Sequence, residues 1–397
     1  MPSSQFRHIL IALAATFWQQ TFVSVGRALP AVLAPVIVAD LNLAPAWIGI
    51  YFAINATSAL IGQLGCGSFI VRYGSLRMNQ IALAMLAAGM ALAAFGSAWG
   101  FALSAIIGGG GAAVSTPASS HLLGRVSPPK QAPLVFSIKQ TAVPVGLLMG
   151  GILGPWITGI SGWRLAFLLV AIACILLAMA LEPLRKSFDD DRVPSHAFRL
   201  SDFHTTLASV LRVRELRTLA MACLAFNGMQ QVVTAYFVIY LTHLDYSLTD
   251  AGLVFSVAMA IAVPGRILWG WAGSGLFTSR AVMAGLAFGM AVSGVAMGFF
   301  TTAWSMWAIV AVSTGISLTA LSWHGILLAE AARAAPEGKR GAVTGGVLSF
   351  GQMGALTEPI IYSVLLSATG SYGVGFIFCA APALIVGVLL VRSPVRG

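Results

Sequence analysis

Twelve apolar runs constrain the fold of this chain more than any other feature of its sequence. Each run is long enough to cross about 30 Å of hydrocarbon as a helix that rises about 1.5 Å per residue. Composition agrees, because 58% of the 397 residues are hydrophobic and 9% are charged, which is too apolar for a soluble surface. The sequence therefore predicts an all-α membrane protein with twelve transmembrane helices, at residues 8–36, 46–70, 78–98, 101–124, 132–157, 163–183, 216–243, 248–273, 281–301, 303–331, 341–367 and 373–391.

The basic residues predict how these helices are oriented. If the N-terminus is cytoplasmic, all but four of the 22 Lys and Arg residues fall in inward-facing loops and tails. Arg164 lies in an outward loop, and Arg27, Lys139 and Arg266 lie within the predicted helices. We therefore expect both termini in the cytoplasm and the protein in the plasma membrane, most simply a bacterial inner membrane. The net charge of +10 then reflects topology rather than a nucleic-acid partner.

The sequence carries no pattern typical of an enzyme. Four cysteines lie inside apolar runs, at a spacing that fits neither a disulfide framework nor a metal site: Cys66, Cys174, Cys223 and Cys379. We find no GxxxxGK[ST] phosphate loop and no Ser/His/Asp or metal-ligand constellation in the loops. We therefore expect no enzymatic activity and no cofactor, and we expect gradients of ions or solutes to drive any transport.

One polar stretch, from Leu184 to Arg217, divides the predicted helices six and six. We predict an N-terminal six-helix bundle at 1–183, a cytoplasmic linker at 184–215 and a C-terminal six-helix bundle at 216–397.

The two halves contain an internal repeat. Trp18-Gln19-Gln20 matches Met229-Gln230-Gln231, and Ser137-Ile138-Lys139-Gln140 matches Ser349-Phe350-Gly351-Gln352. Six helices separate each element from its copy, so both cross the membrane in the same direction. This predicts two bundles related by a pseudo-twofold axis along the membrane normal.

The segment from Gly67 to Arg77, Gly-Ser-Phe-Ile-Val-Arg-Tyr-Gly-Ser-Leu-Arg, resembles the loop signature of the major facilitator superfamily. The resemblance covers the whole chain and implies solute transport by rocking of the two halves. Val71 stands where the family has Asp, and Ser274 stands at the matching position of the second half, so the family's cytoplasmic latch lacks its acid. Gly108–Gly111 is similar to the signature of drug/proton antiporters, but Ala105 replaces their arginine, which disfavours drug efflux.

Two arginines within the predicted helices are candidate substrate-binding residues, because a charge at the bilayer centre costs about 3 kcal/mol unless it faces a cavity or a partner. Arg27 lies eight residues before Pro35, a spacing similar to organophosphate/phosphate antiporters, in which this arginine binds the anion. Arg266 lies eight residues before Ser274, which resembles oxalate/formate antiporters and nitrate/nitrite porters. The alternative for each is a structural ion pair, with Glu330 as a partner for Arg266.

Lys139 is expected at the same depth as Arg266, so the two would concentrate positive potential where an anion passes. The alternative for Lys139 is that its side chain extends to the cytoplasm. Neutral hydrogen-bonding groups complete the predicted substrate site: Gln20, Gln231 and Tyr236.

Proton coupling has two candidate residues. Glu358, directly before Pro359, is the single acid deep within a predicted helix, and it is either the protonation site or the counter-ion of Arg27. His324 titrates in a useful range, although a lone helical histidine is also typical of packing. Glu330 and Arg333 are three residues apart and are expected to pair.

Three positive charges against one negative charge within the membrane predict a small organic anion, such as a carboxylate, as the substrate. We therefore predict a secondary active transporter, proton-coupled or exchanging, that works by alternating access. Its expected partners are the anionic solute, protons and the lipid bilayer, and we expect a functional monomer. The alternatives are a drug/proton efflux antiporter and, in another class, a membrane sensor without transport.

Overall fold

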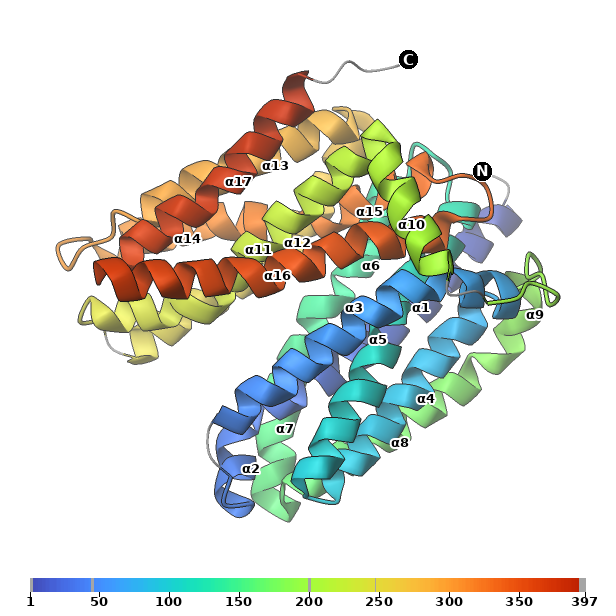
Figure 1. Cartoon of the computed structure of the whole chain (residues 1–397), viewed down its shortest axis with the longest axis horizontal. Helices are drawn as coiled ribbons and strands as arrows, with labels where there is room; N and C mark the ends of the chain where they lie inside the picture. Colours follow the sequence, from blue (N-terminus) through green and yellow to red (C-terminus); the bar gives the residue numbers. More distant parts are fainter. Residues whose placement is uncertain (1–2, 44–45, 199–200, 247, 393–397) are drawn as a thin grey trace. The chain divides into compact units, whose positions relative to one another are not determined.

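The computed structural model describes residues 3–43, 46–198, 201–246 and 248–392, and it contains helices and no strands in these ranges. The chain divides into two compact units (Figure 1). The first unit comprises Met1–Pro128, Lys139–Ser209 and Ala335–Gly346, and the second comprises Pro129–Ile138, Val210–Ala334 and Val347–Gly397. The predicted boundaries at residues 183 and 216 stay a prediction.

The helices of the first half of the chain pack mainly on one another. α4 packs against α5 and α8, α1 packs against α7, and α3 packs against α5. Their bounds are α1 Ser3–Val32, α2 Ala34–Asp40, α3 Ala46–Tyr73, α4 Ser75–Ala94, α5 Ala98–Val126, α6 Ala132–Gln140, α7 Ala142–Ser161 and α8 Trp163–Ala180. Three short elements follow: η1 Glu182–Leu184, α9 Arg185–Phe188 and α10 Ser201–Arg212.

The helices of the second half form a comparable set. α13 packs against α17 and α14, α12 packs against α14, and α11 packs against α17. Their bounds are α11 Arg214–His243, α12 Leu248–Gly275, α13 Ser279–Met297, α14 Met306–Ala320, α15 His324–Ala334, α16 Arg340–Thr369 and α17 Tyr372–Arg392.

Eleven segments in the described part of the chain are long and apolar enough to cross a membrane. They correspond to eleven of the predicted runs. The remaining run, at 341–367, forms α16, which has 30 residues but is less apolar because it carries Glu358 and several glycines. With α16, the helices number twelve as predicted.

Glycine allows close helix approach, and two positions illustrate this. A Cβ at Gly146 would clash with the Thr21 carbonyl oxygen, and a Cβ at Gly354 would clash with the Leu224 carbonyl oxygen. Glycine therefore sets the contact of α7 with α1 and that of α16 with α11.

Three predicted helices are interrupted. The run at 8–36 forms α1 and α2, which are separated at Leu33. The run at 132–157 forms α6 and α7, which are separated at Thr141. Pro144 explains this break, because it has no amide hydrogen to donate to the Gln140 carbonyl oxygen one turn earlier. The run at 303–331 forms α14 and α15, which are separated by residues 321–323. The breaks at Thr141 and at residues 321–323 lie beside the candidate functional residues Lys139 and His324.

Candidate functional site

Lys139 is held inside the first unit by a side chain of α1. It lies in the last turn of α6 and is 2% exposed. Its Nζ donates a hydrogen bond to Gln20 Oε1 at 2.9 Å. The same oxygen accepts hydrogen bonds from Thr116 Oγ1 at 3.1 Å and Ser115 Oγ at 3.4 Å, both on α5. The ammonium is therefore buried between helices rather than extended toward solvent.

The position of Lys139 follows from the local sequence. Because Pro144 ends α6 early, Lys139 lies at the carbonyl end of a helix, where a positive charge is favoured. Within the described ranges, no carboxylate forms an ion pair with it. The cation is thus satisfied by dipoles rather than by a counter-charge.

Gln19 is a second unusual group in this region. It is fully buried, and neither its Oε1 nor its Nε2 has a hydrogen-bond partner in the part of the chain that the structure describes. Ser115 and Thr116 were not predicted from the sequence to be part of the site. The signal for these two residues was a cluster of hydroxyl side chains within one predicted helix, Ser115, Thr116, Ser119 and Ser120.

Arg27 lies on the same face of α1 as Gln20, seven residues or about 10 Å further along the helix. Its side chain is exposed. Among the described residues it forms no ion pair. Gln20, Lys139 and Arg27 therefore mark one polar face of the first unit.

Arg266 has a different environment in the second unit. It lies on α12, is 3% exposed, and its Nε donates to the Leu321 carbonyl oxygen at 2.8 Å. Trp269, one turn further along α12, donates its Nε1 to the Leu318 carbonyl oxygen at 2.6 Å. These carbonyls lie at the end of α14, where no helical N–H follows to satisfy them. Arg266 thus stabilises the break between α14 and α15.

Glu330, the ion-pair partner that we considered for Arg266, pairs with Arg333 at 2.8 Å. The predicted pairing of Glu330 and Arg333 is therefore confirmed.

Glu358 is buried on α16 at 4% exposure. Neither of its carboxyl oxygens has a hydrogen-bond partner among the described residues. The carboxyl group lies against Gly228 of α11, where a Cβ would clash with it. Tyr236, also on α11, donates its hydroxyl to the Pro359 carbonyl oxygen at 3.2 Å and stacks on Tyr362 with ring centroids 4.1 Å apart. The structure thus brings Glu358 and Tyr236 to the same contact between α11 and α16.

His324 begins α15 and stacks on Trp323, with ring centroids 3.7 Å apart. Trp323 in turn donates its Nε1 to Gln230 Oε1 at 3.2 Å. Gln231 is exposed, and its Oε1 accepts a hydrogen bond from Thr234 of its own helix at 3.3 Å. Gln230, rather than Gln231, is therefore the α11 glutamine that reaches the break.

No three His, Cys, Asp or Glu side chains gather at a spacing that suits a metal ion within the described ranges. The arrangement instead places ionisable and amide groups between helices of a multi-pass membrane protein. This is the class of protein to which solute transporters belong.

Comparison with known proteins gives the family. The family model described as Major Facilitator Superfamily matches residues 16–356, which is most of the chain. The chain therefore belongs to the major facilitator superfamily, and it is a transporter with membrane-spanning helices. Transporters of this family carry small solutes, often together with protons.

Individual relatives are distant in sequence. The chain is 23% identical over 406 residues to the probable galactarate/D-glucarate transporter GudP of Bacillus subtilis, covering 90% of this chain and 86% of that protein.

Solved structures share the fold. The E. coli fucose:proton symporter FucP has a TM-score of 0.74 at 14% identity, covering 97% of this chain and all of that one. The human organic anion transporter MFSD10 has a TM-score of 0.76 at 16% identity, covering 98% of this chain and all of that one. The predicted fold class, an all-α protein of twelve transmembrane helices in two six-helix bundles, is confirmed.

Proposed function

We propose that this protein is a secondary active transporter of a small organic acid anion, of the hydroxylated dicarboxylate type. The observation that carries this proposal is the environment of Lys139. Its buried ammonium has an amide partner, Gln20, and no ion-pair partner in the described part of the chain.

Lys139 has hydrogen-bond donors that a ligand could use. An ammonium group has three donors, and Gln20 accepts one of them. A buried cation without a counter-charge costs about 3 kcal/mol in a membrane span. A substrate carboxylate would remove this cost by providing both negative charge and hydrogen-bond acceptors. The exposed guanidinium of Arg27, on the same face of α1, is the second group that we assign to the anion.

A neutral group on α1, the residue before Gln20, supports a hydroxylated substrate. Gln19 presents both an unpartnered donor and an unpartnered acceptor among the described residues, which suits a hydroxyl group. The relative GudP is named as a probable transporter of galactarate and D-glucarate, which are hydroxylated dicarboxylates. The name of this relative guides our choice of substrate class.

Glu358 is the group that we assign to proton coupling. An ionised carboxylate that is buried and accepts no hydrogen bond is strongly disfavoured, so the protonated form suits the described conformation. Release of the proton then requires a change in the surroundings of Glu358, which links protonation to conformation. His324, stacked on Trp323, is the second candidate.

The proposal includes a location in the plasma membrane with both termini in the cytoplasm, because the basic residues concentrate in the inward loops. It also includes function as a monomer, without a cofactor and without enzymatic activity.

Uptake into proteoliposomes tests the proposal. We expect the purified protein to accumulate radiolabelled D-glucarate when the external pH is lower than the internal pH, and we expect unlabelled galactarate to compete. Galactitol is the matched control, since it keeps the hydroxyl groups of galactarate but lacks both carboxylates. Competition by galactitol equal to that by galactarate, or uptake of a hydrophobic cation in place of D-glucarate, would reject the anion assignment.

A further inference from the structure

The linker after α8 docks where the family's loop acid is absent. Val71 and Ser274 occupy the two positions at which the family signature has an acid. Val193 of the linker donates its backbone N–H to the Val71 carbonyl oxygen at 2.8 Å. Just before Val193, the linker carries three consecutive acids, Asp189 to Asp191.

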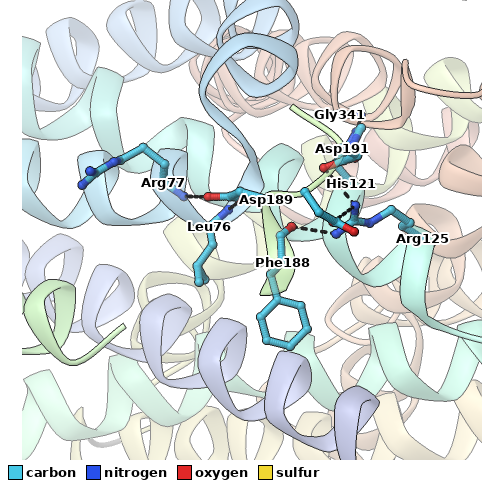
Figure 2. Close-up of polar contacts among 9 residues, drawn as sticks. Leu76, Arg77, His121, Arg125, Phe188, Asp189, Asp191 and Gly341 are labelled. Atoms are coloured by element: carbon cyan, nitrogen blue, oxygen red, sulfur yellow. Dashed lines mark hydrogen bonds and ion pairs between the residues drawn. The ribbon is translucent and has the colours of Figure 1, made fainter. Parts of the chain in front are cut away.

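Asp189 binds the N-terminus of α4 (Figure 2). Its Oδ1 accepts the Leu76 N–H at 2.7 Å and its Oδ2 accepts the Arg77 N–H at 2.9 Å. These amides belong to the first turn of α4, where no helical carbonyl satisfies them and where negative charge is favoured. Gly74 admits this contact, because its φ is +95° and a Cβ there would clash with the Asp189 carboxyl group.

Asp191 reaches the N-terminus of α16 through His121 (Figure 2). His121 Nε2 lies 2.8 Å from Asp191 Oδ2, and His121 Nδ1 accepts the Gly341 N–H at 3.4 Å. Arg125, one turn along α5 from His121, pairs with Asp191 Oδ1 at 3.0 Å. The imidazole therefore connects the Asp191 carboxylate of the linker to the first turn of α16.

The start of α16 also lies beside the end of α3. A Cβ at Gly341 would lie 2.7 Å from Ile70 Cδ1, and a Cβ at Gly67 would clash with Ala342. Val71 lies four residues after Gly67 on the same face of α3, so an acid at position 71 would point toward the first turn of α16. All these residues belong to the first unit, whereas α16 continues beyond Gly346 into the second unit.

We propose that Asp189 and Asp191 of the linker perform the role of the loop acid that Val71 replaces. Asp189 holds the first turn of α4, and Asp191 holds the first turn of α16 through His121. They are positioning residues for the inner helix ends. This inference depends on membership of the family and not on the identity of the substrate.

Hydrogen–deuterium exchange of the full-length protein in lipid nanodiscs tests the proposal. We expect Asp189→Asn to speed exchange of the Leu76 and Arg77 amides by about tenfold, which is typical of a lost helix cap. We expect Asp191→Asn to speed exchange at Gly341 by about threefold to tenfold. Asp190→Asn is the matched control, because it removes the same charge from a side chain that is 67% exposed and bonds only to Arg125 in the described structure, so exchange at both sites should not change.

The decisive variant restores the acid of the family. In the double variant Val71→Asp/Asp191→Asn, exchange at Gly341 should return to the wild-type rate. This recovery would not occur if Asp191→Asn had only lowered the overall stability of the protein. If Asp191→Asn does not fold, His121→Ala removes the same link, and Val71→Asp should restore protection there as well.

Three results would overturn the inference. They are unchanged exchange in Asp189→Asn and Asp191→Asn, equal acceleration in Asp190→Asn, and failure of Val71→Asp to restore protection. Because exchange is measured without substrate, failure of D-glucarate uptake leaves this test intact, and failure of this test leaves the proposed function intact.

Discussion

The two units satisfy their buried cations with different kinds of partner. In the first unit, Lys139 ends a broken helix and bonds to the side-chain amide of Gln20. In the second unit, Arg266 lies beside a broken helix and bonds to the main-chain carbonyl of Leu321. A side-chain amide can rotate away when a ligand arrives, whereas a helix-end carbonyl cannot leave without further unwinding. Lys139 is therefore suited to bind a substrate, whereas the hydrogen bond of Arg266 holds the end of a helix.

The difference shows that a charge within a membrane span does not by itself identify a substrate site. Both side chains are positively charged and nearly completely buried, and the sequence predicts the same depth in the membrane for both. The two cations differ in their hydrogen-bond partners. Two measurements test this distinction, and two more extend the comparison to the acids Glu358 and Asp191.

The largest effect is expected for Lys139→Met, which keeps length and apolar contact but removes the charge. Loss of a buried charge interaction of about 3 to 5 kcal/mol predicts a fall of at least about 100-fold in uptake of D-glucarate. The melting temperature should stay near that of the wild type or rise, since an uncompensated buried charge is removed. Near-normal uptake by this variant would remove Lys139 from the substrate site.

Arg266→Met should act on stability first. It leaves the Leu321 carbonyl oxygen without its guanidinium donor, which predicts a loss of about 2 kcal/mol in the free energy of unfolding. Arg266→Lys should lose less, because one donor and the charge remain. A chemical or thermal unfolding series in detergent measures both. If Arg266→Met unfolds like the wild type and loses only transport, the two cations are equivalent and our comparison fails.

Glu358→Gln should separate exchange from accumulation. The amide resembles a protonated carboxyl group in shape and lacks charge, so internal and external substrate should still exchange. If one proton is coupled, a pH difference of one unit gives about tenfold accumulation in the wild type, and this gain should disappear in the variant. Equal loss of exchange and accumulation would instead favour the counter-ion role.

The smallest effect concerns Asp191, whose carboxylate has donors where Glu358 has none. Burial raises the pKa of Asp191, but the hydrogen bond from His121 and the charges of His121 and Arg125 lower it further, so the net pKa lies below its usual range. A depressed carboxyl pKa stabilises the folded state above the unfolded pKa of about 3.9, and this contribution is lost as the pH falls through the folded value.

The stability of the wild type should therefore exceed that of Asp191→Asn by about 1 kcal/mol at pH 6, and the difference should shrink as the pH falls below about 3.9 toward the lowered pKa of Asp191. Unfolding midpoints measured across this range provide the check. A stability difference that does not decrease at all as the pH falls below about 3.9 would show that Asp191 acts without its charge.

Much of the fold follows from local sequence. The apolar runs predict the helices, and Pro144 signals the break after α6 because proline removes a backbone donor. The break after α14 has no such signal, since Leu321, Ser322 and Trp323 continue an apolar run. Side chains of another helix, Arg266 and Trp269, stabilise that break, so no reading of the segment alone predicts it.

The candidate residues divide in the same way. Residue type and hydrophobic context single out Lys139, Arg266, Glu358 and Arg27 in the sequence, because a charge in an apolar run is costly wherever the helix packs. The acids at 189–191 were predicted only as part of a linker, although a run of three in a chain with 12 acids was a signal of a specific role.

The sequence by itself determined the class of solvent, the number of helices and the sign of the charges buried among them, since these depend on composition and on runs of neighbouring residues. Tertiary structure decided which partner each charge has. Gln20 and Lys139 are 119 residues apart, Arg266 and Leu321 are 55 apart, and Asp189 and Leu76 are 113 apart. A hydrogen bond depends on distances of about 3 Å between atoms that only helix packing brings together, and it is these contacts that distinguish a cation open to a substrate from one that holds a helix end.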